Sequence, residues 1–499
     1  MKRPYSEITH EITKILDDRL KKIKIFDLSV PGWFSCPATH TETHKGKIVH
    51  QLGEEFTLPF TITSLNLAKR NKTGLFKKKF IPEAQRGKNF VQKHFIDECT
   101  VLTRSFDEIQ YAVLDVHNFA LLDTRKPDFV ILDEQHPLDP LNVVIVGEIR
   151  VITAQHGKFS DADVGHATSF GEKLLQLQPR RAYVYVLLTD CRVLMIIQVS
   201  KVIDDRFQYK YTRLAKLESD DGVPAEGWKQ LVTLLSQKPA TLGWVASHVY
   251  HKGEEIKLIR SIGVGRTAVV YEGIYNGNEV AVKVLKDAQF LQCFQLEVDV
   301  MQKLACLNSS TLLKILIFHF DEDSNSGDKS PTFIVLSPLC KQFRNWRKED
   351  IPHIIGTLKK VHDMNIIHRD FRKWNLLRDQ DGNVRIADWG FAVKANQSTA
   401  FAGSLETLPD NALQKVIDGK EITYTPSIEL ISVVRSFYLL LCRPSLKRLP
   451  FGENDIKEGA KIIKEFWRDN ARSSMWMNIL KTAGDADYDN LIKFLMEIF

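Results

Sequence analysis

Short apolar runs separated by polar turns predict two strand pairs in the first half of the chain. Residues 127–132 and 143–151 are rich in β-branched residues, and a polar loop with two prolines separates them. A second pair is predicted at residues 181–200, about the turn Thr189-Asp190-Cys191-Arg192. Runs of this length, bounded by turn-forming residues, are typical of strands in a buried sheet.

Helical spacing of apolar residues marks three further segments of this half. The predicted helices cover residues 106–122, 161–178 and 225–237. The break KPATLGW follows the last of them, and 499 residues are more than one ordinary core accommodates. We therefore predict a first domain at residues 1–238, a linker at 239–251 and a second domain at 252–499.

The second half begins with a strand, a glycine turn, a strand, a hairpin turn and a strand, over residues 255–285. The hairpin turn is Asn276-Gly277-Asn278, and a helix is predicted over residues 288–307. In the glycine turn, Gly263 and Gly265 would let backbone amides approach a phosphate group, because a Cβ would obstruct that approach. A GxG turn by itself is weak evidence for a phosphate site.

Composition limits the class of protein. Hydrophobic residues make up 44% and charged residues 26% of the chain, which is typical of a globular protein and excludes extensive disorder. There is no apolar run of the roughly 18 residues that a membrane helix needs, and the first residues carry no apolar core of a secretory signal. The seven cysteines show no CxxC spacing, so neither a zinc site nor a disulfide framework is predicted. We expect a cytoplasmic or nuclear protein.

The net charge of +6 is modest, but basic residues cluster at positions 69–80, KRNKTGLFKKKF. Two interpretations are open for this segment. It is either a solvated loop or nuclear-import patch, or a surface that contacts phosphates.

Five polar residues of the second half have the types and the order that phosphoryl transfer requires. Transfer of a phosphoryl group depends on positioning and charge neutralisation, with a carboxylate beside the acceptor hydroxyl and oxygen ligands on the metal. The residues are Lys283, Glu297, Asp370, Asn375 and Asp388.

These residues and their motifs resemble the eukaryotic protein kinase signature. VAVK contains Lys283, HRD contains Asp370, and DWG begins at Asp388. The resemblance implies an α+β bilobal kinase fold, with ATP and Mg²⁺ as cofactors and a protein with a serine or threonine acceptor as substrate. It further implies that Asp370 is the catalytic base, that Asn375 and Asp388 bind Mg²⁺, and that Lys283, paired with Glu297, anchors ATP. Arg372 stands where serine/threonine kinases usually carry a lysine, and we expect it to offset the γ-phosphate.

The sequence also departs from the kinase pattern. Ala268 replaces the third glycine, Trp389 replaces the phenylalanine of DFG, no APE motif is visible, and Glu429 replaces an expected aspartate. The candidate phosphoacceptors of the short activation segment are Ser398, Thr399, Ser404 and Thr407. A non-catalytic scaffold and a small-molecule kinase of the aminoglycoside phosphotransferase type are the alternatives. Arg369 and Lys283 favour the protein kinase branch.

In the first half, two acidic residues lie at the predicted paired strands. Asp128 opens one strand, and Glu148 follows 20 residues later, in the other strand, as E-x-R with Arg150. A strand pair would bring these carboxylates together, where they would repel one another unless a cation such as Mg²⁺ lay between them. The alternative is structural, because Glu148 and Arg150 share one face of a strand and can form an ion pair.

The PD and E-x-R pattern resembles the PD-(D/E)XK restriction endonuclease family, which implies an α/β restriction-endonuclease-like domain. The resemblance implies a nuclease-like site at Asp128, Glu148 and Arg150, with Glu108 as a further acid. Because arginine stays protonated, Arg150 suits phosphate binding better than general-base catalysis. Lys173 is a candidate for the missing lysine.

Such a domain followed directly by a kinase resembles the Crinkler group of fungal and oomycete effectors. The similarity lies in architecture and not in chemistry. It implies DNA as a partner of the first domain and the nucleus, including a host nucleus reached after secretion, as the setting.

Overall fold

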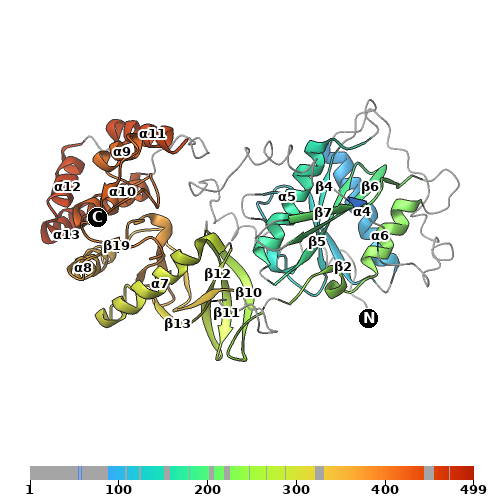
Figure 1. Ribbon diagram of the computed structural model, residues 1–499, viewed down its shortest axis with the longest axis horizontal. Coiled ribbons are helices and arrows are strands. Elements are labelled where there is room, and N and C mark those ends of the chain that lie inside the picture. Colours follow the sequence, from blue (N-terminus) through green and yellow to red (C-terminus); the bar gives the residue numbers. More distant parts are fainter. Residues whose placement is uncertain are drawn as a thin grey trace. The chain divides into compact units, whose positions relative to one another are not determined.

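The computed structural model divides the chain into two compact units, residues 1–247 and 248–499 (Figure 1). The basic segment 69–80 and the predicted acid Glu108 lie outside the described residues. The structure describes residues 54–55, 58, 88–106, 109–122, 125–150, 158–178, 180–201, 207–218, 225–246, 248–265, 267–286, 288–320, 331–442, 455–470 and 473–498.

The first unit is built on an eight-stranded mixed sheet with the order β1-β7-β6-β5-β4-β3-β2, to which β8 adds by pairing with β6. Neighbouring strands are antiparallel except for the parallel pairs β4–β5 and β1–β7. The strands are β1 (Glu54–Glu55), β2 (Tyr111–Asp115), β3 (Phe129–Asp133), β4 (Val143–Ile149), β5 (Tyr183–Thr189), β6 (Val193–Lys201), β7 (Phe207–Tyr211) and β8 (Ala215–Lys216).

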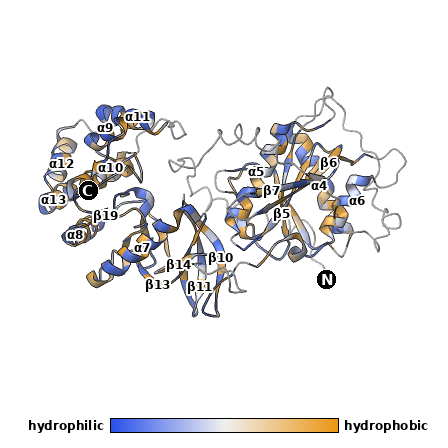
Figure 2. Cartoon of the chain, viewed as in Figure 1, coloured by the Kyte–Doolittle hydropathy of each residue, from blue (hydrophilic) through white to orange (hydrophobic). Residues whose placement is uncertain are grey.

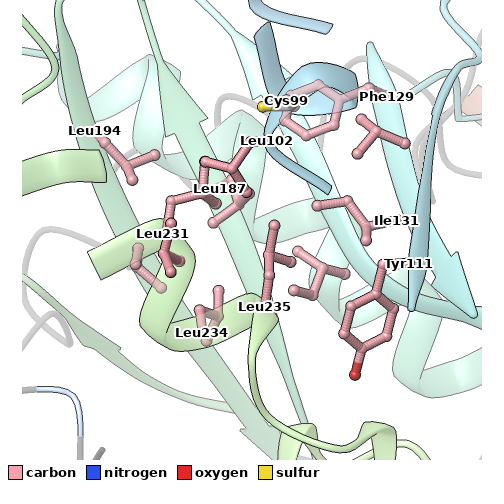
Figure 3. Close-up of a cluster of buried hydrophobic side chains, with 14 of the residues drawn as sticks. Cys99, Leu102, Tyr111, Phe129, Ile131, Leu187, Leu194, Leu231, Leu234 and Leu235 are labelled. Carbon is pink, nitrogen blue, oxygen red and sulfur yellow. The ribbon is translucent and has the colours of Figure 1, made fainter. Parts of the chain in front are cut away.

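Helices α4 (Lys88–Ser105) and α6 (Glu226–Leu235) contribute to one buried cluster with the sheet (Figure 3). Cys99 and Leu102 of α4 and Leu231 of α6 lie in this cluster with residues of the strands. Helix α5 (Asp161–Leu177) connects the parallel strands β4 and β5, as a crossover must. Its N-terminus is fixed by a capping box, in which Ser160 and Asp163 bond reciprocally.

The strand pairs predicted at 127–132 with 143–151 and at 181–200 are confirmed. The helices predicted at 161–178 and 225–237 are also confirmed, as α5 and α6. The helix predicted at 106–122 is wrong, because residues 111–115 form strand β2. Tyr111 and Val113 are buried while Ala112 and Leu114 are half-buried, which is the period of two of a strand with one buried side.

A buried arginine ties the end of the first unit to its sheet. Arg181 donates hydrogen bonds to four backbone carbonyls and to the side chain of Gln178, at 2.6–2.9 Å. One of the carbonyls belongs to Leu242, in the short 3₁₀ helix η5 (Pro239–Leu242). Residues at the start of the predicted linker are therefore packed onto the first unit, whereas its last residues form strand β9 (His248–His251) of the second.

The second unit begins with a six-stranded antiparallel sheet with the order β13-β14-β12-β11-β10-β9. The predicted succession of strand, glycine turn, strand, hairpin and strand is confirmed, and Asn276 and Gly277 take the positive φ angles of a tight hairpin turn. The remaining strands of this sheet are β10 (Glu254–Val264), β11 (Ala268–Tyr275), β12 (Asn278–Leu285), β13 (Lys314–His319) and β14 (Phe333–Ser337).

Helix α7 (Leu291–Leu304) follows β12, within the predicted range, and the rest of the unit is mainly helical. Figure 2 shows its helices banded with hydrophilic and hydrophobic residues, the pattern of helices that bury one face. The helices are α8 (Asp350–Asp363), α9 (Asp410–Ile417), α10 (Pro426–Cys442), α11 (Asp455–Asp469), α12 (Ser474–Gly484) and α13 (Tyr488–Glu497). Short strands lie between them: β15 (Cys340–Gln342), β16 (Ile366–Ile367), β17 (Leu376–Asp379), β18 (Val384–Ile386), β19 (Val393–Lys394), β20 (Ser398–Thr399) and β21 (Ile422–Thr423).

A β-sheet lobe followed by a helical lobe is the arrangement of a bilobal kinase fold. In the part of the chain that the structure describes, no helix has both the length and the apolar character needed to span a bilayer.

Gly147 gives a test of the sheet that carries Glu148. A Cβ at Gly147 would lie 2.0 Å from the ring of Phe129, its partner across the β3–β4 pair. Gly147→Ala should destabilise the first unit by about 1–3 kcal/mol or more, because a buried ring and a strand would both have to move. Hydrogen exchange should show lost protection in residues 125–150 and unchanged protection in β12. Phe129→Leu should partly rescue the variant, and equal protection in Gly147→Ala and wild type would contradict this account.

Candidate functional site

The site of the second unit is organised around one buried lysine. Lys283 of β12 donates to Glu297 of α7 at 2.5 Å and to Asp388, which follows β18, at 2.8 Å. Lys283 is only 7% exposed. Burial works against its charge, but Asp388 and Glu297 outweigh burial and hold the pKa of Lys283 above its ordinary value. One ammonium group thus joins the sheet, helix α7 and the segment that carries Asp388.

The glycine turn between β10 and β11 could accommodate a Cβ at both glycines. A Cβ at Gly263 would meet its nearest protein atom at 3.8 Å, and one at Gly265 at 3.5 Å. These are ordinary contacts, so the packing of the described protein atoms does not require glycine at either position. Space beside backbone amides is what a phosphate group needs in such a turn. Ala268, which replaces the third glycine, is buried at the start of β11.

The carboxylate of Asp370 is held in place through one of its oxygens. Asn375 donates to Oδ2 at 3.0 Å and to the Asp370 carbonyl at 2.8 Å, while Arg372 Nε lies 3.1 Å from Oδ2. Oδ1 is buried and has no hydrogen-bond partner among the described residues. Burial raises the pKa of Asp370. The arrangement leaves one carboxylate oxygen for an acceptor hydroxyl, as a general base requires.

Asn375 and Asp388 are the side chains that fit a divalent cation in this unit. The amide nitrogen of Asn375 is used by Asp370, so its amide oxygen is the atom suited to a cation. Lys283 holds the pKa of Asp388 below its ordinary value despite burial, so this carboxylate is ionised. Amide and carboxylate oxygens are ligands that Mg²⁺ accepts, with waters and phosphates completing the set.

Trp389 and Glu429, which depart from the kinase pattern, are both buried and contact residues near Asp370. Trp389 is fully buried, and its ring lies 4.5 Å from that of His368. Glu429 of α10 accepts a hydrogen bond from the backbone N–H of Arg369 at 2.9 Å and lies 2.6 Å from His362 Nε2. The longer side chain thus holds the backbone beside Asp370. Tyr488 of α13 lies 2.6 Å from the other ring nitrogen of His362 and extends this buried network.

The activation segment is anchored although no APE motif is present. Asp410, at the start of α9, pairs with Arg435 of α10 at 2.6 Å, and Arg435 also donates to the carbonyl of Leu408. The hydroxyl of Thr407 donates to the carbonyl of Phe371 at 3.1 Å. These bonds fix the end of the segment beside Phe371, the residue after Asp370. The sequence contained the signal as Pro409-Asp410, but its partner Arg435 is recognisable only in the fold.

The four candidate phosphoacceptors differ in accessibility. Ser398 is exposed and Thr399 is half-buried, whereas Ser404 and Thr407 are buried. A kinase could reach Ser404 or Thr407 only after the segment had left its place. Ser398 and Thr399 are therefore the better candidates for modification.

The first unit has a second cluster of buried charge, which contains Asp128 and Glu148. Asp128 Oδ2 accepts a hydrogen bond from the backbone of Ile149 at 2.8 Å, so the carboxylate turns toward β4. Glu148 is 1% exposed, and neither of its oxygens accepts a well-aligned hydrogen bond from the described residues. The structure thus brings together the two acids that the sequence pattern singled out.

Side-chain nitrogen atoms of three residues lie within 4 Å of Glu148 Oε1. Arg150 lies 2.8 Å away, His166 of α5 lies 3.6 Å away and Lys88 of α4 lies 3.7 Å away. The ion pair of Glu148 and Arg150, expected from their spacing, is present. Burial first, and then Arg150, lower the pKa of His166 to about 4, so its ring is neutral at neutral pH.

Lys88 and His166 are the residues near Glu148 that the sequence analysis missed. The sequence carried no local signal, because Lys88 precedes Asp128 by 40 residues. Lys173, the candidate considered instead, lies on α5 seven residues beyond His166, or about 10 Å along the helix. The helix therefore presents His166, and not Lys173, to Glu148.

Asp128 and Glu148 fit a divalent cation by their chemistry and by the unsatisfied oxygens of Glu148. Among the described residues, however, no group of three or more His, Cys, Asp or Glu side chains is arranged to hold a metal ion. A cation bound here would rely on water or phosphate oxygens for its remaining ligands.

The pKa of Glu148 predicts how stability depends on pH. Burial, and after it the charge of Asp128, raise this pKa from 4.5 to about 8. A raised carboxyl pKa favours the folded state while the group is protonated, so its stabilisation is lost as the pH rises from 4.5 to about 8. Each pKa unit corresponds to about 1.4 kcal/mol.

Relative to Glu148→Gln, the wild type should therefore lose stability across this pH range in the presence of a chelator. Thermal unfolding of the two proteins measures the difference. Glu134→Gln, at an exposed position after β3, is the matched control and should follow the wild type. Parallel curves for wild type and Glu148→Gln would show that Glu148 does not titrate as described.

Each unit contains a range of residues that matches the model of a known protein family. Residues 88–181 match the model of a domain of unknown function (DUF6826), a range that includes Lys88, Asp128, Glu148 and Arg150. Residues 256–496 match the model of the protein kinase domain. This range contains Lys283, Glu297, Asp370, Asn375 and Asp388 in the geometry described above. The chain therefore contains a protein kinase domain.

Proposed function

We propose that the second unit is an active, ATP- and Mg²⁺-dependent protein kinase that phosphorylates serine or threonine. The observation that carries this proposal is the joint placement of Lys283, Glu297 and Asp388, with a free oxygen on Asp370. A scaffold would not need these groups in mutual contact.

Each group has a task in phosphoryl transfer. Lys283 would bind the α and β phosphates, and Mg²⁺, held by Asn375 and Asp388, would neutralise charge on the transferred group. Oδ1 of Asp370 would accept the proton of the acceptor hydroxyl as it attacks. Arg372, which lies beside Asp370, would offset the charge of the γ-phosphate.

The first test is transfer of labelled phosphate from ATP to protein substrates with Mg²⁺. Asp370→Ala should lower the rate by about 10²–10⁴-fold, the usual contribution of a general base. Asp388→Ala should also remove activity, because it deletes a cation ligand and a partner of Lys283. Asp381→Ala, at an exposed aspartate after β17, should retain activity. Absence of labelling in every protein would favour the scaffold alternative.

Analysis of the labelled amino acid and of the substrate class completes this test. Label on serine or threonine of proteins is expected. Label on tyrosine would contradict the proposed acceptor. Transfer to hydroxylated small molecules but not to proteins would favour the alternative of the aminoglycoside phosphotransferase type.

A second proposal concerns the first unit. We propose that it is a restriction-endonuclease-like module that binds the phosphates of DNA at Asp128, Glu148 and Arg150, as the Crinkler-type architecture implies, with the nucleus as its setting. The order of α4, three antiparallel strands, α5 and a parallel strand supports the interpretation, as does the burial of both acids. Because Arg150 cannot be a general base, the proposal covers binding and not cleavage.

Duplex DNA binding at increasing salt tests this second proposal. Affinity should fall steeply with salt, because released counterions drive such binding, and the DNA should stay intact. Arg150→Gln should weaken binding, while Arg104→Gln, on α4, is a control of equal charge change. Binding that is absent or insensitive to salt would remove DNA from the proposal.

From the contacts of Arg369 we predict that the kinase does not require phosphorylation of its activation segment. Arg369, the arginine of HRD, donates to the carbonyl of Ala400 and stacks 4.8 Å from the ring of Tyr424. Kinases that require such phosphorylation use arginines to hold the phosphate. Here the arginine already holds the segment through a carbonyl and a ring.

Phosphatase-treated protein and the double variant Ser398→Ala, Thr399→Ala should therefore keep the wild-type rate. Removal of phosphate should be verified by intact mass. A rate that collapses on treatment and returns after rephosphorylation would contradict the prediction.

A further inference from the structure

Lys88 lies between the two buried carboxylates of the first unit. Its ammonium nitrogen is 3.0 Å from Asp128 Oδ1 and 3.7 Å from Glu148 Oε1. Arg150 approaches Glu148 from β4 and also lies 3.8 Å from Asp163 of α5. Among these cations, Lys88 is the one for which ion pairs with both Asp128 and Glu148 are seen in the described part of the chain.

The two acids are buried, whereas Lys88 is partly exposed to solvent. Asp128 is 3% and Glu148 1% exposed, so water does little to stabilise their charges. The side chain of Lys88, in contrast, is 43% exposed. Its ammonium can exchange the carboxylates for water at small cost, whereas the carboxylates, when both are ionised, cannot lose it unless another cation takes its place.

The position of Lys88 in α4 is unfavourable for the helix itself. Lys88 is the first residue of α4, and the first turn contains no acidic residue. A cation there opposes the positive end of the helix dipole. The favourable interactions of Lys88 are therefore with the two carboxylates and not with its own helix.

We propose that Lys88 is the exchangeable counter-ion of this site, so that its ammonium and a divalent cation compete for the place between Asp128 and Glu148. This inference rests on the proposed function in taking the two acids as cation ligands, but it does not require DNA binding. When a divalent cation binds, it takes over both carboxylates, and Lys88 is released to solvent. In the absence of a divalent cation, Lys88 is a positioning residue that reduces the repulsion between the two acids.

Chemical labelling of the wild-type chain tests the exchange without a substitution at Lys88. The rate at which an acetylating reagent modifies Lys88 is measured by mass spectrometry with and without Mn²⁺. Release of the ammonium should accelerate acetylation of Lys88 by about fivefold or more, within the usual range of coupling between two ligands. Lys93 of the same helix is exposed and should show no change. An unchanged rate at Lys88 would overturn the proposal.

A binding measurement tests the same competition from the side of the metal. The free Mn²⁺ signal in electron paramagnetic resonance is titrated with the full chain carrying Asp388→Asn, which disables the cation site of the kinase unit. In that chain, Lys88→Gln should bind Mn²⁺ about tenfold more tightly or better, because the competitor is gone. Lys93→Gln should bind as the parent does, and adding Glu148→Gln to Lys88→Gln should abolish the gain.

The outcomes separate this inference from the proposed functions. Tighter Mn²⁺ binding in Lys88→Gln with no DNA binding by the wild type would support the counter-ion and reject the DNA proposal. Equal or weaker Mn²⁺ binding in Lys88→Gln, relative to Lys93→Gln, would overturn the counter-ion even if DNA binds. If Lys88→Gln folds poorly without metal, recovery of its melting temperature on adding Mn²⁺ supports the proposal, and failure to recover overturns it.

Discussion

Two buried carboxylates that are both ionised repel one another unless a cation lies between them, and each unit of this chain places one lysine beside such a pair. Lys283 joins Glu297 and Asp388 in the second unit, and Lys88 joins Asp128 and Glu148 in the first. In both places the lysine comes from a different element than the acids, so the ion pairs also fix how those elements meet. The ion pairs of each site therefore also contribute to the packing of its unit.

The two lysines differ in exposure, and this difference sets what each site can do. Lys283 is enclosed, and two short contacts keep it charged and in place, which suits a permanent part of a nucleotide site. Lys88 reaches its carboxylates from an exposed position, which suits a cation that can leave. In the first unit, Arg150 remains beside Glu148 as a second positive charge. That unit therefore keeps positive charge available for an anion even after Lys88 has moved.

Two carboxylates of the kinase unit make buried contacts at positions where the sequence departs from the kinase pattern. Glu429 is longer than the expected aspartate, yet it accepts from the backbone of Arg369 and contacts His362. Asp410 pairs with Arg435 and anchors the activation segment where no APE motif is present. The sequence placed Glu429 at the position of the expected aspartate, but the contacts of Glu429 and the pairing of Asp410 with Arg435 were visible only in the fold.

The sequence by itself determined the elements whose signals are local. β-rich apolar runs bounded by turns predicted the strand pairs, helical spacing predicted α5 and α6, and Asn276-Gly277-Asn278 predicted the hairpin. Motif order predicted a kinase domain at residues 252–499, and the family match covers residues 256–496. The segment at Tyr111–Asp115 was assigned to a helix because its short apolar run fits both periods, and only pairing with β3 made it a strand. The sequence also did not predict which charged side chains pair with one another. Lys88 with Asp128 and Arg435 with Asp410 are separated by 40 and 25 residues, and no spacing rule relates such positions. These pairs form because folding brings the acids close to basic side chains that are distant in the sequence. Only the tertiary structure decides which basic side chain lies within reach of each acid.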